Sequence, residues 1–244
     1  AMYIAGGIVF SQVSGTDVPG GIAGNNSSNA VAALTVNGTA NVTIGTLSTQ
    51  DDDVDGLTVV NAGTGTLTLT LDAAQLDQTA AVITAGADSV LGTADDVITT
   101  PRNVDALSFT STSTGRIVLN INGSVNLSDD VITGVSSIVL ANGAQVTLSL
   151  DQVRALGEAN VKLASGAFAA GLVVNSIGTQ PFDSTAVPDG IAITAVMAAG
   201  NIVLDAATNL RDITTLTVNN GTTLTMTATQ ATQLVNEALT TGTG

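Results

Sequence analysis

The sequence predicts an all-β protein, and three observations support this prediction. Short segments such as residues 67–71 alternate an apolar residue with Thr, which is the two-residue period of a half-buried strand. Turns rich in Asn and Gly separate these segments. A strand–turn–strand pattern also recurs along the chain, as in solenoids. We therefore expect parallel β-solenoid-like repeats with short helices, and a stack of antiparallel β-sandwich modules is the alternative.

The recurring pattern returns at an interval of about eighty residues. Its three copies cover about residues 30–80, 106–157 and 191–240. Each copy reads as a strand, a turn, a second alternating strand and a glutamine, and these glutamines are Gln75, Gln152 and Gln230. They are separated by 77 and 78 residues. We expect residues 1–29 to form an N-terminal strand or irregular segment that precedes a repetitive β domain over residues 30–244.

Short helices are predicted directly after the alternating strands. Asp72 and Asp151 each follow such a strand, and we expect their side chains to act as helix N-caps. Residues 228–239 predict a longer helix that covers the last coil. Upstream of the second and third glutamines, residues 116–120 also resemble residues 201–205.

The composition excludes several classes of function. The chain has 244 residues and no His, Cys or Trp, so zinc sites with nitrogen and sulfur ligands, Ser-His pairs and disulfides are ruled out. Its formal net charge of -15 argues against binding nucleic acid or anionic lipid. Aromatic residues make up 2%, which disfavours a small-molecule active site. No apolar stretch is long enough to span a membrane, and we expect neither membrane insertion nor enzymatic activity.

The first candidate metal site is an acidic run. Asp51, Asp53 and Asp55 occupy alternate positions and are followed by Gly56, a spacing that calcium loops use to direct carboxylates at one ion. An EF-hand would need Glu at the twelfth position, where Ala62 stands. The run is therefore either a Ca²⁺-binding turn between two strands or an acidic surface turn without an ion.

A second candidate lies in a glycine-containing loop. It comprises Asp88, Asp95 and Asp96, and Ca²⁺ is the expected cofactor because it prefers hard oxygen ligands. The first 101 residues hold ten Asp and no basic residue, so a divalent cation there would relieve repulsion between carboxylates. Asp129 and Asp130 are expected to serve turns and caps instead.

The strand repeats also carry a family resemblance. Residues 138–156 and 216–230, with their Thr-, Asn- and Gly-rich pattern, resemble the β-strand repeats of large bacterial surface proteins, namely S-layer proteins and adhesins exported by type I secretion. The calcium nonapeptide G-G-x-G-x-D is absent. The resemblance implies an extracellular structural protein of a bacterial cell surface that self-assembles and is stabilised by calcium.

Two other functions stay open at this point. One is an adhesin or glycan-binding stalk module, for which a cell-surface glycan would be the partner instead of further copies of the chain. The other is a polysaccharide-active β-solenoid enzyme or fibre, since paired carboxylates can hydrolyse glycosidic bonds.

Overall fold

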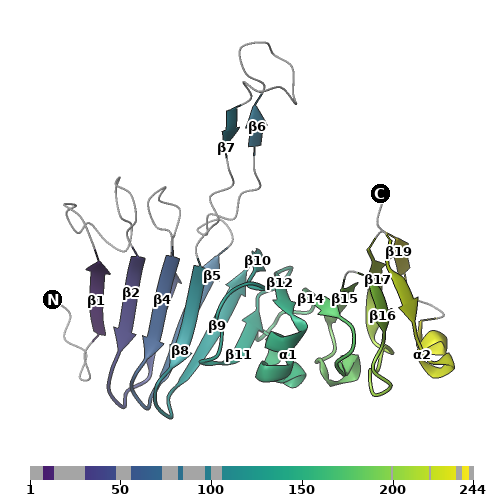
Figure 1. Cartoon of the computed structure of the whole chain (residues 1–244). Helices are drawn as coiled ribbons and strands as arrows, with labels where there is room; N and C mark the ends of the chain where they lie inside the picture. The colour runs from purple at the N-terminus through teal and green to yellow at the C-terminus, as the bar shows by residue number, and fades with distance from the viewer. Residues whose placement is uncertain are drawn as a thin grey trace.

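The protein folds as a β-solenoid of about six turns, the parallel architecture that the sequence predicts. A computed structural model describes residues 8–13, 31–47, 56–72, 82–84, 97–99, 106–198, 200–219, 221–234 and 238–241. In Figure 1 the strands stand in a row from β1 (Ile8–Val13) to β19 (Ala238–Thr241), which lie at opposite ends. The stacked antiparallel sandwiches are thereby excluded, because strands of successive turns pair in parallel.

Four sheets run along the solenoid. The first has the order β1-β2-β4-β8 and adds β2 (Val31–Val36), β4 (Gly56–Asn61) and β8 (Ala106–Ser111) to β1. The second has the order β13-β11-β9-β5-β3 and comprises β3 (Val42–Leu47), β5 (Thr66–Asp72), β9 (Arg116–Asn122), β11 (Val135–Leu140) and β13 (Val161–Leu163). The third ends in β19 and contains β10 (Ser124–Asn126), β12 (Gln145–Ser149), β14 (Ala170–Ile177), β15 (Ile191–Met197) and β17 (Ile213–Val218). The fourth pairs β16 (Asn201–Val203) with β18 (Thr223–Thr225).

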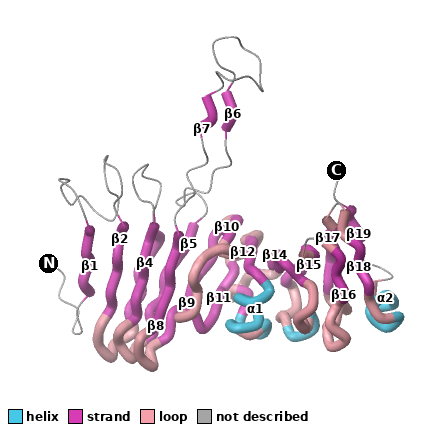
Figure 2. The backbone as a smooth tube through the Cα atoms, viewed as in Figure 1, coloured by secondary structure: helices cyan, strands magenta, loops and turns pink. Residues whose placement is uncertain are grey.

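The remaining elements are short. They are the hairpin strands β6 (Val82–Thr84) and β7 (Val97–Thr99), the helices α1 (Leu150–Leu156) and α2 (Ala228–Gln233), and 3₁₀ turns at Glu158–Asn160 and Ser184–Ala186. Figure 2 shows the helical segments along one side of the row of strands, whereas the β6–β7 hairpin projects from the other side. The N-terminal strand β1 pairs antiparallel with β2, and β6 pairs antiparallel with β7, whereas the strands of successive solenoid turns pair in parallel.

The core is a set of apolar ladders that run from turn to turn. One ladder in the second sheet joins Ile44, Leu69, Leu119, Ile138 and Val161, and one in the third sheet joins Val125, Val146, Leu172, Ile193 and Ile213. Nearly all of these side chains are buried, and each contributes about 1.5–3 kcal/mol by leaving water. The threonines between Leu67, Leu69 and Leu71 are half-buried on the other face of β5, so the predicted alternation is confirmed.

Glycines allow the corners between the first and second sheets to stack closely. A Cβ atom on Gly63 would lie 2.2 Å from the carbonyl oxygen of Gly38, and one on Gly65 would lie 2.1 Å from that of Ala40. One turn later, a Cβ on Gly115 would lie 2.4 Å from the oxygen of Gly63. Because all these neighbours are backbone atoms, only glycine lets one corner rest on the next.

The Asn-Gly turns are corners between sheets and not hairpin loops. Asn142 and Gly143 join β11 in the second sheet to β12 in the third, and Gly143 has φ of 76°. Asn122 and Gly123 make the same change of sheet between β9 and β10, with φ of 78° at Gly123. A positive φ turns the chain sharply at little cost in glycine, which explains the residue at these positions.

The two later copies of the sequence repeat have the same structure. Ser149 caps α1 and Thr227 caps α2, and each forms a capping box with the glutamine three residues on, Gln152 or Gln230. The Gln152 amide also donates to the carbonyl oxygens of Leu127 (2.6 Å) and Asp130 (2.8 Å) in the preceding turn.

Gln230 repeats this arrangement one copy later. Its amide donates to the carbonyl oxygens of Asp205 (2.8 Å) and Thr208 (3.0 Å). Each of these two copies also has a bulge in one strand. The extra residue is Ser136 in β11 and Thr214 in β17, and the two lie 78 residues apart, the same interval as between Gln152 and Gln230. The spacing of the glutamines therefore marks the site where each short helix is tied to the turn before it.

Three local predictions are wrong. Asp151 is not an N-cap, because Ser149 caps α1 and Asp151 lies in its first turn. The N-cap predicted at Asp72 stays a prediction, because Asp72 ends β5 and the residues that would form its helix lie outside the described residues. The helix predicted over residues 228–239 ends at Gln233, and the chain returns to a strand, β19, which pairs with β17. Residues 116–120 and 201–205 are not structurally equivalent. Residues 116–120 lie in β9, whereas residues 201–203 form β16. Because β16 pairs with β18 as β10 pairs with β12, β16 corresponds to β10 and not to β9.

Candidate functional site

The predicted metal ligands lie outside the described residues. Asp51, Asp53 and Asp55 belong to the connection between β3 and β4, and Asp88, Asp95 and Asp96 to the connection between β6 and β7. The antiparallel pairing of β6 with β7, in which Thr84 is opposite Val97, holds the two ends of the second connection together. In the part of the chain that the structure describes, no three carboxylates gather closely enough to hold a metal ion.

Three described carboxylates, those of Asp130, Asp183 and Asp205, accept hydrogen bonds from backbone N–H groups. The Asp130 carboxylate accepts from the Leu107 N–H at 2.9 Å and so holds the start of β8. Asp183 accepts from the Thr185 N–H at 3.1 Å, and Asp205 from the Ala207 N–H at 2.8 Å. The bonds of Asp183 and Asp205 are turn interactions between residues two apart, whereas the Asp130 bond joins residues 23 apart and ties separate segments of the solenoid together. The Asp129 side chain is exposed.

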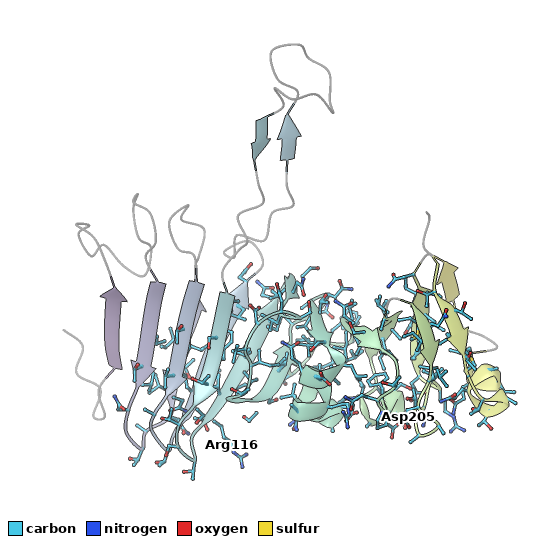
Figure 3. All side chains as sticks on the ribbon, in the orientation of Figure 1. Arg116 and Asp205 are labelled. Carbon is cyan, nitrogen blue, oxygen red and sulfur yellow. The ribbon has the colours of Figure 1, made fainter. Side chains whose placement is uncertain are left out.

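Figure 3 marks two residues that show how charge is distributed on the surface. Arg116 begins β9 and its exposed side chain points away from the body of the solenoid. Asp205 lies at the opposite half, where its backbone oxygen accepts from Gln230. All five basic residues of the sequence follow residue 101, and Arg116 is the first of them among the described residues.

A charged groove of about 320 Å³ opens beside β15 and β17. Residues 187–190 form one wall and residues 211–214 the other, and its charged side chains are Asp189, Arg211 and Asp212. All three side chains are exposed, so water screens them and each pairwise interaction is weak. The groove offers polar contacts to a ligand but no desolvated group that could act as a nucleophile or general base.

A second groove of about 320 Å³ lies at the beginning of α1. Ser149, Asp151, Ser176 and Gln180 contribute polar groups, and Ile202 is among the apolar residues that line it. Ser176 has φ of 63°, a conformation that costs a non-glycine residue of order 1 kcal/mol. No aromatic side chain lines either groove, which makes both unlike the apolar pockets that bind small molecules tightly.

Among the side chains that the structure describes, one aromatic ring lies on the surface. Phe168 is 78% exposed in the corner between β13 and β14. Its backbone N–H donates to the Asn142 side chain at 3.2 Å, and this interaction ties the corner to the turn before it. Val203 is also exposed, at 62%, but it lies in the fourth sheet, so the two do not form one apolar patch.

Sequence reasoning missed Asn61, the most deeply buried of the corner amides. It is 1% exposed, and its amide donates to the carbonyl oxygens of Gly65 (2.9 Å) and Arg116 (3.0 Å). Its side-chain oxygen accepts from the Gly63 N–H at 3.1 Å. The sequence signal was present, because Asn61 follows an apolar strand and precedes the two glycines that stack at the corner.

Comparisons of the chain with protein-family models, with curated proteins and with solved structures found no match. Among the helices of the described residues, none has the length and apolar character needed to cross a bilayer. The apolar ladders, the stacked corners and the distribution of carboxylates are therefore the features that bear on function.

Proposed function

We propose that this chain is a structural component of a bacterial cell-surface layer, which acts outside the cell, assembles with further copies of itself and is stabilised by Ca²⁺. The observation that carries the proposal is the pair of apolar ladders that continue through the second and third sheets. Every turn is hydrogen-bonded to its neighbours, so the ladders join the coils into one elongated unit.

The distribution of polar groups supports a scaffold rather than a catalyst. Gln152, Gln230 and Asn61 use their amides to fasten one turn to another. The charged groove beside β15 leaves its charges in water, where they gain no catalytic strength. The buried polar groups therefore serve the stack, and the outer face of β5 presents short, half-buried threonine side chains.

Calcium enters the proposal through the uncompensated carboxylates of the first 101 residues. The candidate ligands Asp51, Asp53 and Asp55 lie in a connection between two turns, and the other three lie in the β6–β7 connection. A divalent cation at either place would neutralise neighbouring carboxylates and couple metal binding to the folding of that connection.

The test uses the purified chain with Ca²⁺, with Mg²⁺ and with a chelator. We expect ordered assemblies by electron microscopy only with Ca²⁺. We also expect the midpoint of thermal unfolding to rise by about 5–10 °C when Ca²⁺ reaches about a hundred times its dissociation constant, since this adds about 2.7 kcal/mol to the free energy of unfolding. The triple variant Asp51→Asn, Asp53→Asn, Asp55→Asn should lose part or all of this rise.

A matched triple variant controls for the change in net charge. It carries Asp129→Asn, Asp189→Asn and Asp212→Asn, three exposed carboxylates in the described coils, and it should respond to Ca²⁺ as the unmodified chain does. Assembly that is the same with Ca²⁺ and with chelator contradicts the metal proposal alone. A chain that stays monomeric at every concentration and adheres to glycan-coated surfaces contradicts the assembly proposal and points to a stalk module.

A further inference from the structure

Three corners of the solenoid contain the dipeptide Asn-Gly within the described residues. They are Asn37-Gly38, Asn122-Gly123 and Asn142-Gly143, and φ of the glycine is 109°, 78° and 76° in turn. A glycine that follows asparagine leaves its backbone nitrogen open to the asparagine side chain, because it has no Cβ. The three corners share this dipeptide but differ in how the structure holds it.

We propose that Asn37 is a site of spontaneous covalent modification in the folded protein, whereas Asn142 is protected. In this reaction the Gly38 nitrogen loses its proton to solvent base and attacks the side-chain carbonyl carbon of Asn37. A carbon–nitrogen bond forms, the side-chain amide leaves as ammonia, and a five-membered succinimide results. Water then adds to one of its two carbonyl carbons, and the ring opens to Asp or to isoaspartate.

The Asn142 corner restrains both reacting groups. The Gly143 N–H donates to the Ala169 carbonyl oxygen at 2.7 Å, so its nitrogen is not available as a nucleophile. The Asn142 side-chain oxygen accepts from the N–H groups of Phe168 (3.2 Å) and Ala169 (3.3 Å) and is directed toward the next turn. Reaction at Asn142 therefore requires that these hydrogen bonds open together.

The Asn37 corner lacks these restraints. The Asn37 side chain is exposed, and within the described residues it has no hydrogen-bond partner. No described residue accepts a hydrogen bond from the Gly38 N–H either, whereas the Gly38 carbonyl oxygen accepts from Thr64 N–H at 2.8 Å. The nucleophilic nitrogen and the amide are thus both free to meet. Asn122 is an intermediate case, because its amide donates to the Asp72 carboxylate.

The product would change a corner on which the next turn rests. A Cβ atom on Gly63 would lie 2.2 Å from the Gly38 carbonyl oxygen, so there is no spare space between the two corners. Isoaspartate adds one backbone carbon to the chain at this place, and Asp adds one more carboxylate to an N-terminal part that has no basic residue. Modification at Asn37 should therefore loosen the first corner, independently of whether the chain forms a surface layer.

The experiment follows deamidation of the full chain in a mildly alkaline buffer by peptide mapping with mass spectrometry. In the folded chain we expect Asn37 to convert at least about tenfold faster than Asn142, a ratio that corresponds to an opening free energy of about 1.4 kcal/mol at the protected corner. In urea, where the corners are unfolded, the two asparagines should convert at similar rates. The variant Asn37→Gln should lose the fast signal and keep the slow one.

Three results would overturn the proposal. One is conversion of Asn142 as fast as Asn37 in the folded chain, which would mean that the hydrogen bonds at residues 142 and 143 give no protection. The second is a folded chain in which Asn37 stays intact over a period that converts it in urea. The third is a rate ratio that persists in urea, since the difference would then come from local sequence.

Discussion

The stacked glycine corners allow one prediction to be worked out from the structure in detail. In the variant Gly65→Ala, the new Cβ would lie 2.1 Å from the Ala40 oxygen and 2.6 Å from its carbonyl carbon. Ordinary contact begins at 3.4 Å, so the corner must move by more than an ångström. Because the obstacle is backbone, no side-chain rotation can relieve it.

The cost has two parts. Forcing a methyl group into a closed space costs about 1–3 kcal/mol. The displacement also stretches hydrogen bonds to the Gly65 carbonyl oxygen, from the Asn61 amide (2.9 Å) and from the Arg116 N–H (3.3 Å), each worth about 1 kcal/mol. We expect the free energy of unfolding to fall by roughly 3–5 kcal/mol in total.

Urea unfolding followed by far-ultraviolet circular dichroism measures this loss. The midpoint should fall by about 1–2 M relative to the unmodified chain, given a slope near 2–3 kcal/mol per M. The matched control is Gly45→Ala, since a Cβ on Gly45 has no atom within 4 Å and its φ is compatible with alanine. This control should leave the midpoint unchanged or raise it slightly, because alanine has less freedom to lose on folding.

A clear result would refute this reasoning. If Gly65→Ala and Gly45→Ala unfold at the same urea concentration, then the corners of successive turns do not rest on each other as the structure describes. The glycines would in that case reflect only the conformational needs of isolated turns.

Two further predictions concern the ties between turns and the ladders. The variant Gln230→Ala loses the capping box of α2 and the hydrogen bonds to the carbonyl oxygens of Asp205 and Thr208, so it should lower the free energy of unfolding by about 2–3 kcal/mol. The matched control is Thr229→Ala at the exposed neighbouring position, which should change the free energy of unfolding by less than about 0.5 kcal/mol. Equal urea midpoints for these two variants would show that Gln230 does not hold α2 to the preceding turn. The variant Val146→Ala removes two fully buried methyl groups and should cost about 2–3 kcal/mol by the same assay, while Val203→Ala, at a position 62% exposed, should cost less than about 0.5 kcal/mol. A similar loss in both would mean that the ladder at Val146 is not the packed core of the third sheet.

The sequence by itself predicted the strands and the interval of the repeat. The alternation of Leu67, Leu69 and Leu71 with threonine is a local pattern, so the buried face of β5 could be predicted without knowing its neighbours. The glutamine spacing also proved structural, because Gln152 and Gln230 occupy equivalent positions in the first turns of α1 and α2. Their contacts were not predictable, since the carbonyl oxygens that they bind lie more than twenty residues upstream.

The helix boundaries were predicted less well, because the start of a short helix depends on which one or two residues cap it. Asp151 is a good N-cap by type, yet Ser149 has the extended backbone and reaches the N–H of Gln152. Residues 228–239 are locally helical in pattern, but the edge of β17 recruits Ala238–Thr241 into a sheet. In the second place a tertiary contact outweighed a local preference, whereas in the first one local cap replaced another.

The candidate calcium ligands remain a sequence-based proposal, because Asp51, Asp53, Asp55, Asp88, Asp95 and Asp96 all lie outside the described residues. What residue order alone determined is the face of a regular strand such as β5 that avoids water, since side chains alternate along an unbroken strand. Only the tertiary structure decided that the Asn-Gly turns are corners between parallel sheets, that glycines support one corner upon the next, and that Asn142 is held while Asn37 is free. These features depend on hydrogen bonds and contacts between turns about twenty-five residues apart, which exist only once the coils have stacked.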